Sequence, residues 1–260
     1  MMNKHTTGMT LAAGVATAAA AQTDSAAVDK ALEMLKTYDW GDDREALNPI
    51  DRAIVATHGD ATGRSALEKS LVDVLAGGLS RSAQDYVCRK LRVVGTGRSV
   101  EALAALLPDD KTSHIARYAL ERIPDEKAVE VLRDALPKVS TKLKPGMIGS
   151  LGARRDTKSI KAIAEHLGNS NMETAQAAAH ALGLIGTPAA AQELRAFATK
   201  APATMKLPVA DACLICAEQL LADGEKSEAL ALYKELRGDK QATHVRTAAM
   251  KGMLAATTKK

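Results

Sequence analysis

Large aromatic side chains are nearly missing from this sequence. Phe, Trp and Tyr together make up 2% of its 260 residues, with one Trp, one Phe and four Tyr. Compact cores usually rely on such side chains for buried area, so Ala and Leu must supply it here. Both are strong helix formers, and small Ala side chains let helices approach closely. This composition favours many closely stacked helices over sheets.

Other missing features exclude several functions. After the N-terminus no segment has about twenty apolar residues in a row, so no integral membrane segment is expected in the mature chain. The formal net charge is only +4, which by itself does not indicate a nucleic-acid partner. A P-loop, a nucleophile elbow, a dinucleotide fingerprint and an H-E-x-x-H pattern are all missing. We therefore predict no enzyme, no catalytic residue, no metal site and no cofactor.

The N-terminus has the layout of a secretory signal peptide. Lys4 and His5 form a short positive region, and an uncharged, Ala-rich stretch follows over residues 6–21. Small residues stand before Gln22, as a cleavage site requires. We expect a signal peptide over residues 1–21, cleavage after Ala21, and export to the periplasm or cell envelope. A disordered or helical leader on a cytoplasmic protein is the alternative.

A motif of about thirty residues recurs through the chain. Its anchors are Leu91, Leu120, Leu151 and Leu182, spaced 29, 31 and 31 residues apart. Positions 9, 12 and 16 after each anchor form one apolar helical stripe. In the four units the stripe consists of Val100, Leu103 and Leu107; Val129, Leu132 and Leu136; Ile160, Ile163 and Leu167; and Ala191, Leu194 and Ala198.

Each unit reads as an antiparallel pair of helices. Position 5 after the anchor is always Asp or Thr, whose side chain can cap the second helix. A single pair cannot bury both of its apolar stripes, so neighbouring pairs must stack. A fifth unit is anchored by Leu220, 38 residues after Leu182, with the extra length in a Pro-containing loop over residues 199–208. Its first helix should begin near Pro208.

The chain ends carry less regular units. Residues 28–40 form an amphipathic helix, residues 48–75 a helix pair with its turn at 58–63, and residues 244–254 a final capping helix. We predict an all-α fold, a right-handed α-solenoid of about six antiparallel helix pairs, present as a monomer. Its parts are a linker and capping helix at 22–45, the solenoid at 46–256 and a disordered tail at 257–260.

The repeat resembles HEAT repeats, particularly the PBS-lyase HEAT-like type. The resemblance rests on the turn "LGLIGTP" and the helix "AAAHALG", and it covers residues 28–256. The chain is also similar to exported HEAT-repeat proteins of planctomycete-like bacteria. The resemblance implies a scaffold that binds another protein. The alternative that it implies is an accessory subunit or module of an enzyme, like those that attach bilin chromophores. One departure is Arg154, where the other units have Val94, Ile123 and Ile185.

Cys213 and Cys216 form the only C-x-x-C pattern. A redox role would need the first Cys at a helix N-terminus, whereas this pair lies inside an apolar helix. Core packing, a local disulfide and a metal site are the three interpretations, with packing favoured. His114 and His180 are single residues on different units. Iron-binding HEAT enzymes use His-Glu pairs, and this chain has only Glu165-His166, in reversed order.

The second helices should expose a ridge that continues from unit to unit. Its central charged positions are Glu130, Asp134, Lys161 and Glu165. This mixed, mildly acidic surface lacks the basic stripe and stacking aromatics of nucleic-acid binders. We predict that it binds another protein. Arg154 and Arg155 share one turn, which is either an anchor for an anionic partner or an exposed basic turn.

Overall fold

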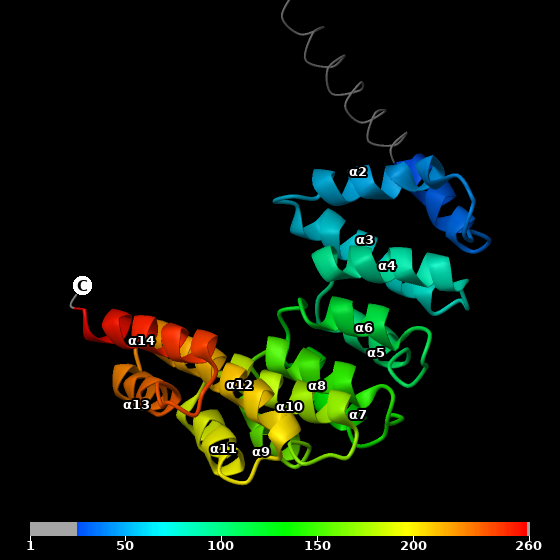
Figure 1. Ribbon diagram of the computed structural model, residues 1–260. Coiled ribbons are helices and arrows are strands. Elements are labelled where there is room, and N and C mark those ends of the chain that lie inside the picture. Colours follow the sequence, from blue (N-terminus) through cyan, green and yellow to red (C-terminus); the bar gives the residue numbers. More distant parts are fainter. Residues whose placement is uncertain (1–24, 259–260) are drawn as a thin grey trace, which may run out of the picture. The chain divides into compact units, whose positions relative to one another are not determined.

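The computed structural model describes residues 25–258, and those residues form helices and turns without any strand (Figure 1). The all-α prediction is confirmed, and the fold is of the α-solenoid type. The predicted signal peptide and the last two residues of the predicted tail lie outside the described residues. The chain divides into two compact units, one ending at Leu103 and the other beginning at Ala104. Each unit is considered by itself below.

The first unit contains the irregular N-terminal helices and the first regular repeat. Asp60, Ser80 and Thr96 each accept a hydrogen bond from a backbone N–H at the start of the element that follows them, as N-caps do. The elements are a helix over 25–35, the 3-10 helix η1 (Arg44–Leu47), α2 (Asn48–Ala56), α3 (Ala61–Leu75), α4 (Arg81–Val94), the 3-10 helix η2 (Gly97–Ser99) and the start of α5 (Val100–Ala104).

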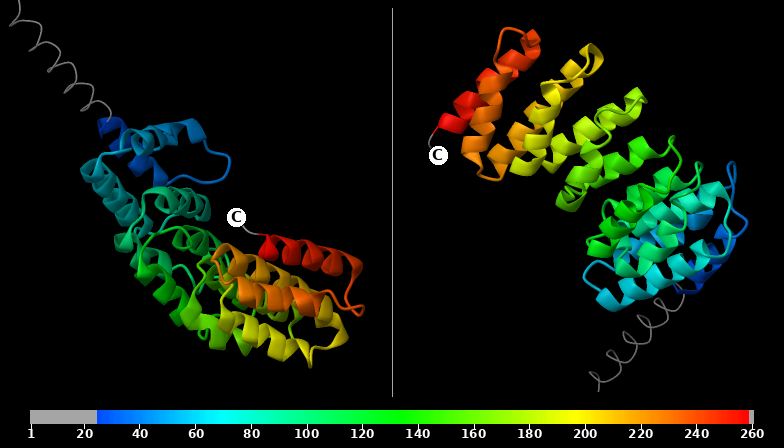
Figure 2. Two further views of the ribbon diagram at one scale, coloured as in Figure 1. Left: turned by 90° about the vertical axis from the view of Figure 1, so that its left-hand side faces the viewer. Right: turned by 90° about the horizontal axis from the view of Figure 1, so that it is seen from below.

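The second unit is a run of stacked helix pairs (Figure 2). α10 packs against both α8 and α12, so the first helices of successive repeats form one continuous layer. The elements are α6 (Ser113–Leu120), α7 (Glu126–Ala135), α8 (Lys144–Ala153), the 3-10 helix η3 (Thr157–Ser159), α9 (Ile160–Ala164), α10 (Met172–Ile185), α11 (Pro188–Ala198), α12 (Ala203–Ala222), α13 (Lys226–Leu236) and α14 (Thr243–Thr257).

The predicted repeat register is confirmed at nearly every position. The five anchors Leu91, Leu120, Leu151, Leu182 and Leu220 are all fully buried. The stripe residues at positions 9, 12 and 16 are also buried, including those of the fifth repeat. The exception is Ala198, which is exposed while its neighbour Phe197 is buried. The helix pairs therefore bury one continuous apolar layer within each unit, as the spacing requires.

Two helical glycines mark where consecutive first helices come closest. A Cβ atom added to Gly152 of α8 would lie 2.7 Å from the Cα of Ala181 on α10. A Cβ added to Gly183 of α10 would lie 2.7 Å from the carbonyl oxygen of Ala212 on α12. Glycine at these two positions lets the backbones of neighbouring repeats touch, which a larger residue would prevent.

The start of the fifth repeat differs from the prediction. α12 begins at Ala203 and contains Pro208, so only residues 199–202 of the expected loop are non-helical. Proline cannot donate a hydrogen bond to the carbonyl four residues earlier, which belongs to Thr204. Thr204 is exposed, so water can satisfy that carbonyl. The extra residues of this repeat therefore lengthen the helix instead of forming a loop.

Candidate functional site

The predicted ridge is exposed in the second unit. Glu130 and Asp134 lie on α7, Lys161 lies on α9, and Glu165 follows α9 directly; all four side chains are exposed. Within residues 25–258 none of the four side chains forms an ion pair or hydrogen bond. Their charges are therefore available to a partner without breaking a contact inside the chain.

A small apolar groove adjoins the ridge, and the sequence did not indicate it. Its volume is about 270 Å³, and Asp134 and Lys138 supply its charged groups. The remaining lining is apolar and comes from Ala104, Leu107, Pro108, Val131, Ala135 and Val139. Pro108 and Val139 belong to turns of two different repeats, so only stacking brings them together. The ridge thus combines exposed charge with a place for an apolar side chain.

Arg154 does not form part of an exposed basic turn. The side chain is half-buried, and its guanidinium donates to backbone carbonyls at the end of α6 and just after it, in the preceding repeat. Nη1 lies 3.2 Å from the oxygen of Leu120, and Nη2 lies 3.0 Å from the oxygen of Asp125. The last carbonyls of a helix lack partners within the helix. Arg154 satisfies such groups, so its guanidinium is engaged within the chain, and a role as an anchor for an anionic partner stays a prediction.

Arg155 is likewise engaged, but with the repeats that follow. Its φ of 51° is left-handed, which is uncommon for a residue other than glycine. Nε donates to the carbonyl of Ile185 at the end of α10, at 3.2 Å, and the guanidinium pairs with Asp223 after α12. This pairing raises the pKa of Arg155 and lowers the pKa of Asp223. One side chain thereby connects three successive repeats.

Asp156 departs from the predicted capping role. Thr96, Asp125 and Thr187 cap the elements that follow them, but Asp156 does not cap the backbone of η3. Its buried carboxylate pairs with Nε of Arg133, at 2.8 Å, and accepts a hydrogen bond from the hydroxyl of Ser159. The carboxylate that the local sequence predicts to be a helix cap thus forms an ion pair with an arginine of the preceding repeat.

The thiols lie in the core. Cys213 and Cys216 are buried on α12, neither is in a disulfide, and burial raises the pKa of each to about 12. Cys213 stands in the middle of α12, far from the helix N-terminus that a redox thiol uses. A thiol with such a pKa stays protonated at neutral pH. The packing interpretation therefore agrees with the geometry.

The histidines remain apart, as expected. His114 lies on α6 and His180 on α10. Burial, and after it the charge of Lys144, lowers the pKa of His166, which is half-buried beside Glu165. Within residues 25–258 no three His, Cys, Asp or Glu side chains are placed to hold a metal ion. In the same part of the chain, no helix is long and apolar enough to cross a membrane.

Comparison with known proteins agrees with the repeat geometry. The profile of the family described as HEAT repeats matches residues 138–212. This segment consists of HEAT repeats. The match spans α8, η3 and α9 to α11 and ends inside α12.

Solved structures with similar arrangements include two crystal structures of engineered proteins. Both are 17% identical to this chain. One has a TM-score of 0.41 and covers 80% of this chain and 96% of that chain. The other has a TM-score of 0.43, with 90% and 69% covered. Human deoxyhypusine hydroxylase in complex with glycerol is 14% identical, with a TM-score of 0.35 and 91% and 98% covered. No curated protein sequence matches the chain.

Proposed function

We propose that this chain is a non-catalytic HEAT-repeat scaffold that binds another protein through the ridge of its second helices. The observation that carries the proposal is the set of four exposed, unpaired charged side chains at equivalent positions of two adjacent repeats. Stacking holds Glu130, Asp134, Lys161 and Glu165 on successive second helices of one unit. Such a fixed row of charges favours partners of complementary charge and speeds their association.

The groove beside Asp134 indicates what such a partner presents. Its apolar lining suits an aliphatic or aromatic side chain, and buried anchors of this kind supply much of the binding energy at protein interfaces. Three of the four ridge charges are acidic, so basic side chains beside that anchor would complement Glu130 and Asp134. We therefore expect a partner segment with an apolar residue flanked by Lys or Arg.

The test is charge reversal on the ridge. Glu130→Lys with Asp134→Lys should leave the helical signal and melting temperature nearly unchanged, because both side chains are exposed and unpaired. Proteins captured from the native extract by the parent chain, and identified by mass spectrometry, should be lost or reduced with this variant. A matched control, Glu173→Lys with Glu218→Lys, reverses two exposed charges on first helices and should retain capture.

A second comparison separates the scaffold from a redox role. Cys213→Ala with Cys216→Ala should capture the same proteins as the parent chain, apart from losses that follow from weaker packing. If capture is unchanged by the charge reversal on the ridge but is lost when the two thiols are removed, the scaffold proposal is refuted.

We also propose that the chain is exported. The support is the charge-free, Ala-rich stretch over residues 6–21 that follows Lys4 and His5. Sequencing the N-terminus of protein recovered from the native cell envelope should give a start at Gln22. Protein that starts at Met1 and is confined to the cytoplasm would contradict export.

A further inference from the structure

The fourth repeat is the irregular one in the second unit. In the other four repeats, the position sixteen residues after the anchor is a buried leucine that belongs to the second unit. These leucines are Leu107, Leu136, Leu167 and Leu236. The fourth repeat has Ala198 there instead, and Ala198 is exposed. The same repeat is the longest, because 38 residues separate Leu182 from Leu220. The fourth repeat thus lacks the buried leucine of the other repeats, and it is also the repeat with the longer spacing.

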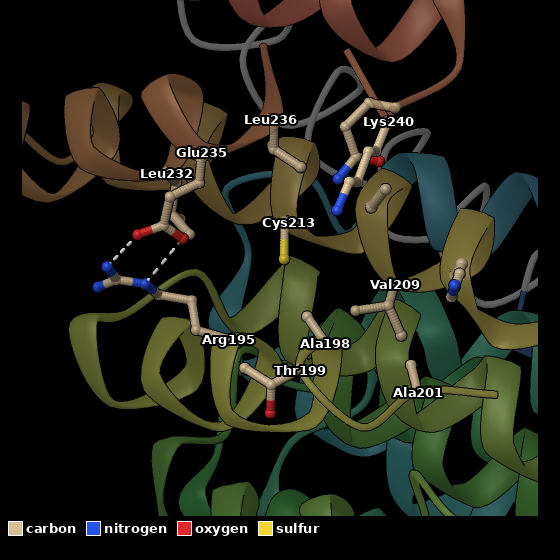
Figure 3. Close-up of a pocket in the computed structure, with 13 residues that line it drawn as sticks. Arg195, Ala198, Thr199, Ala201, Val209, Cys213, Leu232, Glu235, Leu236 and Lys240 are labelled. Carbon is tan, nitrogen blue, oxygen red and sulfur yellow. Dashed lines mark hydrogen bonds and ion pairs between the residues drawn. The ribbon is translucent and has the colours of Figure 1, made fainter. Parts of the chain in front are cut away.

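A cavity of about 390 Å³ lies at this position (Figure 3). It is bounded by the end of α11, the first half of α12, the end of α13 and the turn before α14. Its walls are mainly apolar and include Ala198, Ala201, Val209, Cys213, Leu232 and Leu236. Burial raises the pKa of Cys213 to about 12, so its thiol is neutral and adds to the apolar wall. Small-molecule sites have this size and this mainly apolar character.

The charged groups around the cavity are mostly cationic. Arg195 of α11 and Glu235 of α13 form an ion pair on one side, with Nε of Arg195 3.0 Å from Oε2 of Glu235 (Figure 3). Lys206 and Lys240 also line the cavity, and within residues 25–258 neither forms an ion pair. The two lysines are exposed. Two ammonium groups that form no ion pair within the described residues thus border the apolar walls.

We propose that this cavity binds an aliphatic carboxylate. The hydrocarbon chain lies against the apolar walls, in the space left by alanine at position 198, and the carboxylate meets Lys206 and Lys240. Removing the hydrocarbon from water provides most of the affinity, and the charged hydrogen bonds to ammonium groups select an anionic head group. This ligand site is separate from the protein-binding ridge and does not depend on the function proposed above.

The first experiment compares ligands of equal chain length by titration calorimetry. Octanoate should bind, whereas 1-octanol and octylammonium should bind at least severalfold more weakly, because only the carboxylate matches the lysines. Hexanoate should bind about tenfold more weakly than octanoate, since it buries two fewer methylene groups. Equal binding of octanoate and 1-octanol would overturn the charge argument. No binding of any of the four at millimolar concentration would overturn the site.

The second experiment restores the leucine of the other repeats. Ala198→Leu should fill the cavity, raise the melting temperature of the ligand-free protein and lower octanoate affinity at least tenfold. Its control is Ala196→Leu, an exposed position of α11 that does not line the cavity and should leave binding unchanged. If Ala198→Leu folds and binds octanoate as the parent does, the ligand lies elsewhere and the proposal is wrong.

The third experiment tests the cationic rim. Lys206→Ala with Lys240→Ala should weaken octanoate binding severalfold and leave 1-octanol binding unchanged. The control, Lys127→Ala with Lys251→Ala, removes two exposed lysines that do not line this cavity, and should change neither. An equal effect of the two double variants would show that the lysines act only through net charge, and would overturn their assignment to the site.

Discussion

Two glycines three residues apart on α8 should respond in opposite ways to the same substitution. Around Gly149, an added Cβ atom meets nothing within 4 Å. Around Gly152, it would lie 2.7 Å from the Cα and 2.8 Å from the Cβ of Ala181 on the neighbouring helix α10. The first site is open and the second is where two repeats touch, so alanine tests the packing of the array directly.

The expected magnitudes follow from two effects. Alanine in a helix interior is favoured over glycine by about 1 kcal/mol, and both sites gain this. Gly149→Ala should therefore stabilise the chain by about 1 kcal/mol. Gly152→Ala also forces α8 away from α10, and overpacking of this kind costs about 1–3 kcal/mol. Since the backbone of Ala181 cannot move aside like a flexible side chain, we expect the upper half of that range and a net loss of about 1–2 kcal/mol.

The assay is urea unfolding followed by far-UV circular dichroism. The difference between the two variants isolates the overpacking, because the helix-propensity gain is common to both, and it should be about 2–3 kcal/mol. In thermal melts, each kcal/mol should shift the midpoint by about 2–4 °C. Adding Ala181→Gly to Gly152→Ala should recover only part of the loss, because the backbone of α10 still blocks the new methyl group. A Gly152→Ala protein at least as stable as Gly149→Ala would refute the close packing of α8 on α10.

Three further predictions concern the core, one ion pair and a thiol. Leu132→Ala, at a fully buried stripe position, should cost about 2–5 kcal/mol in urea unfolding, whereas Lys161→Ala should cost under about 0.5 kcal/mol; similar costs would contradict the register. Because Arg155 lowers the pKa of Asp223 from 3.8, the pair stabilises the fold above that pH and loses its effect as the pH falls through the lowered value. The stability gap between the parent and Asp223→Asn should thus shrink below pH 3.8, and a gap that grew there would contradict the pairing. Iodoacetamide should modify Cys213 slowly at mildly alkaline pH, because its pKa is about 12, and rapidly in urea, as mass spectrometry can show; equal rates would place the thiol outside the core.

Local pattern was sufficient for most of the fold. The recurring leucines, the apolar stripe and the Asp or Thr at the turn each depend on residues within one helix pair, so sequence spacing predicts them. All five anchors are buried, and three of the four capping residues act as caps. The ridge positions could be predicted for the same reason, because the exposed face of an amphipathic helix is the complement of its buried stripe.

The early start of α12 is a local difference, but what the sequence missed about Arg154, Arg155 and Asp156 involves residues of other repeats. Arg154 and Arg155 look like an exposed basic turn until the carbonyls of α6 and α10 and the carboxylate of Asp223 are placed beside them. The sequence predicts that Asp156 caps a helix, but its carboxylate pairs with Arg133 of the preceding repeat. Such interactions join residues 23 to 68 positions apart in the chain. The spacing of residues within one helix pair therefore cannot predict them.

The sequence by itself therefore determined the repeat, its register and its all-helical class, because these rest on propensity and spacing within about thirty residues. Tertiary structure alone decided which exposed-looking charges are engaged, and where side-chain volume is missing. Ala198 continues the apolar stripe in sequence, yet it is exposed and lines a cavity that α12 and α13 also border. Whether a stripe position is filled depends on the repeat that packs against it, and that neighbour is specified elsewhere in the chain.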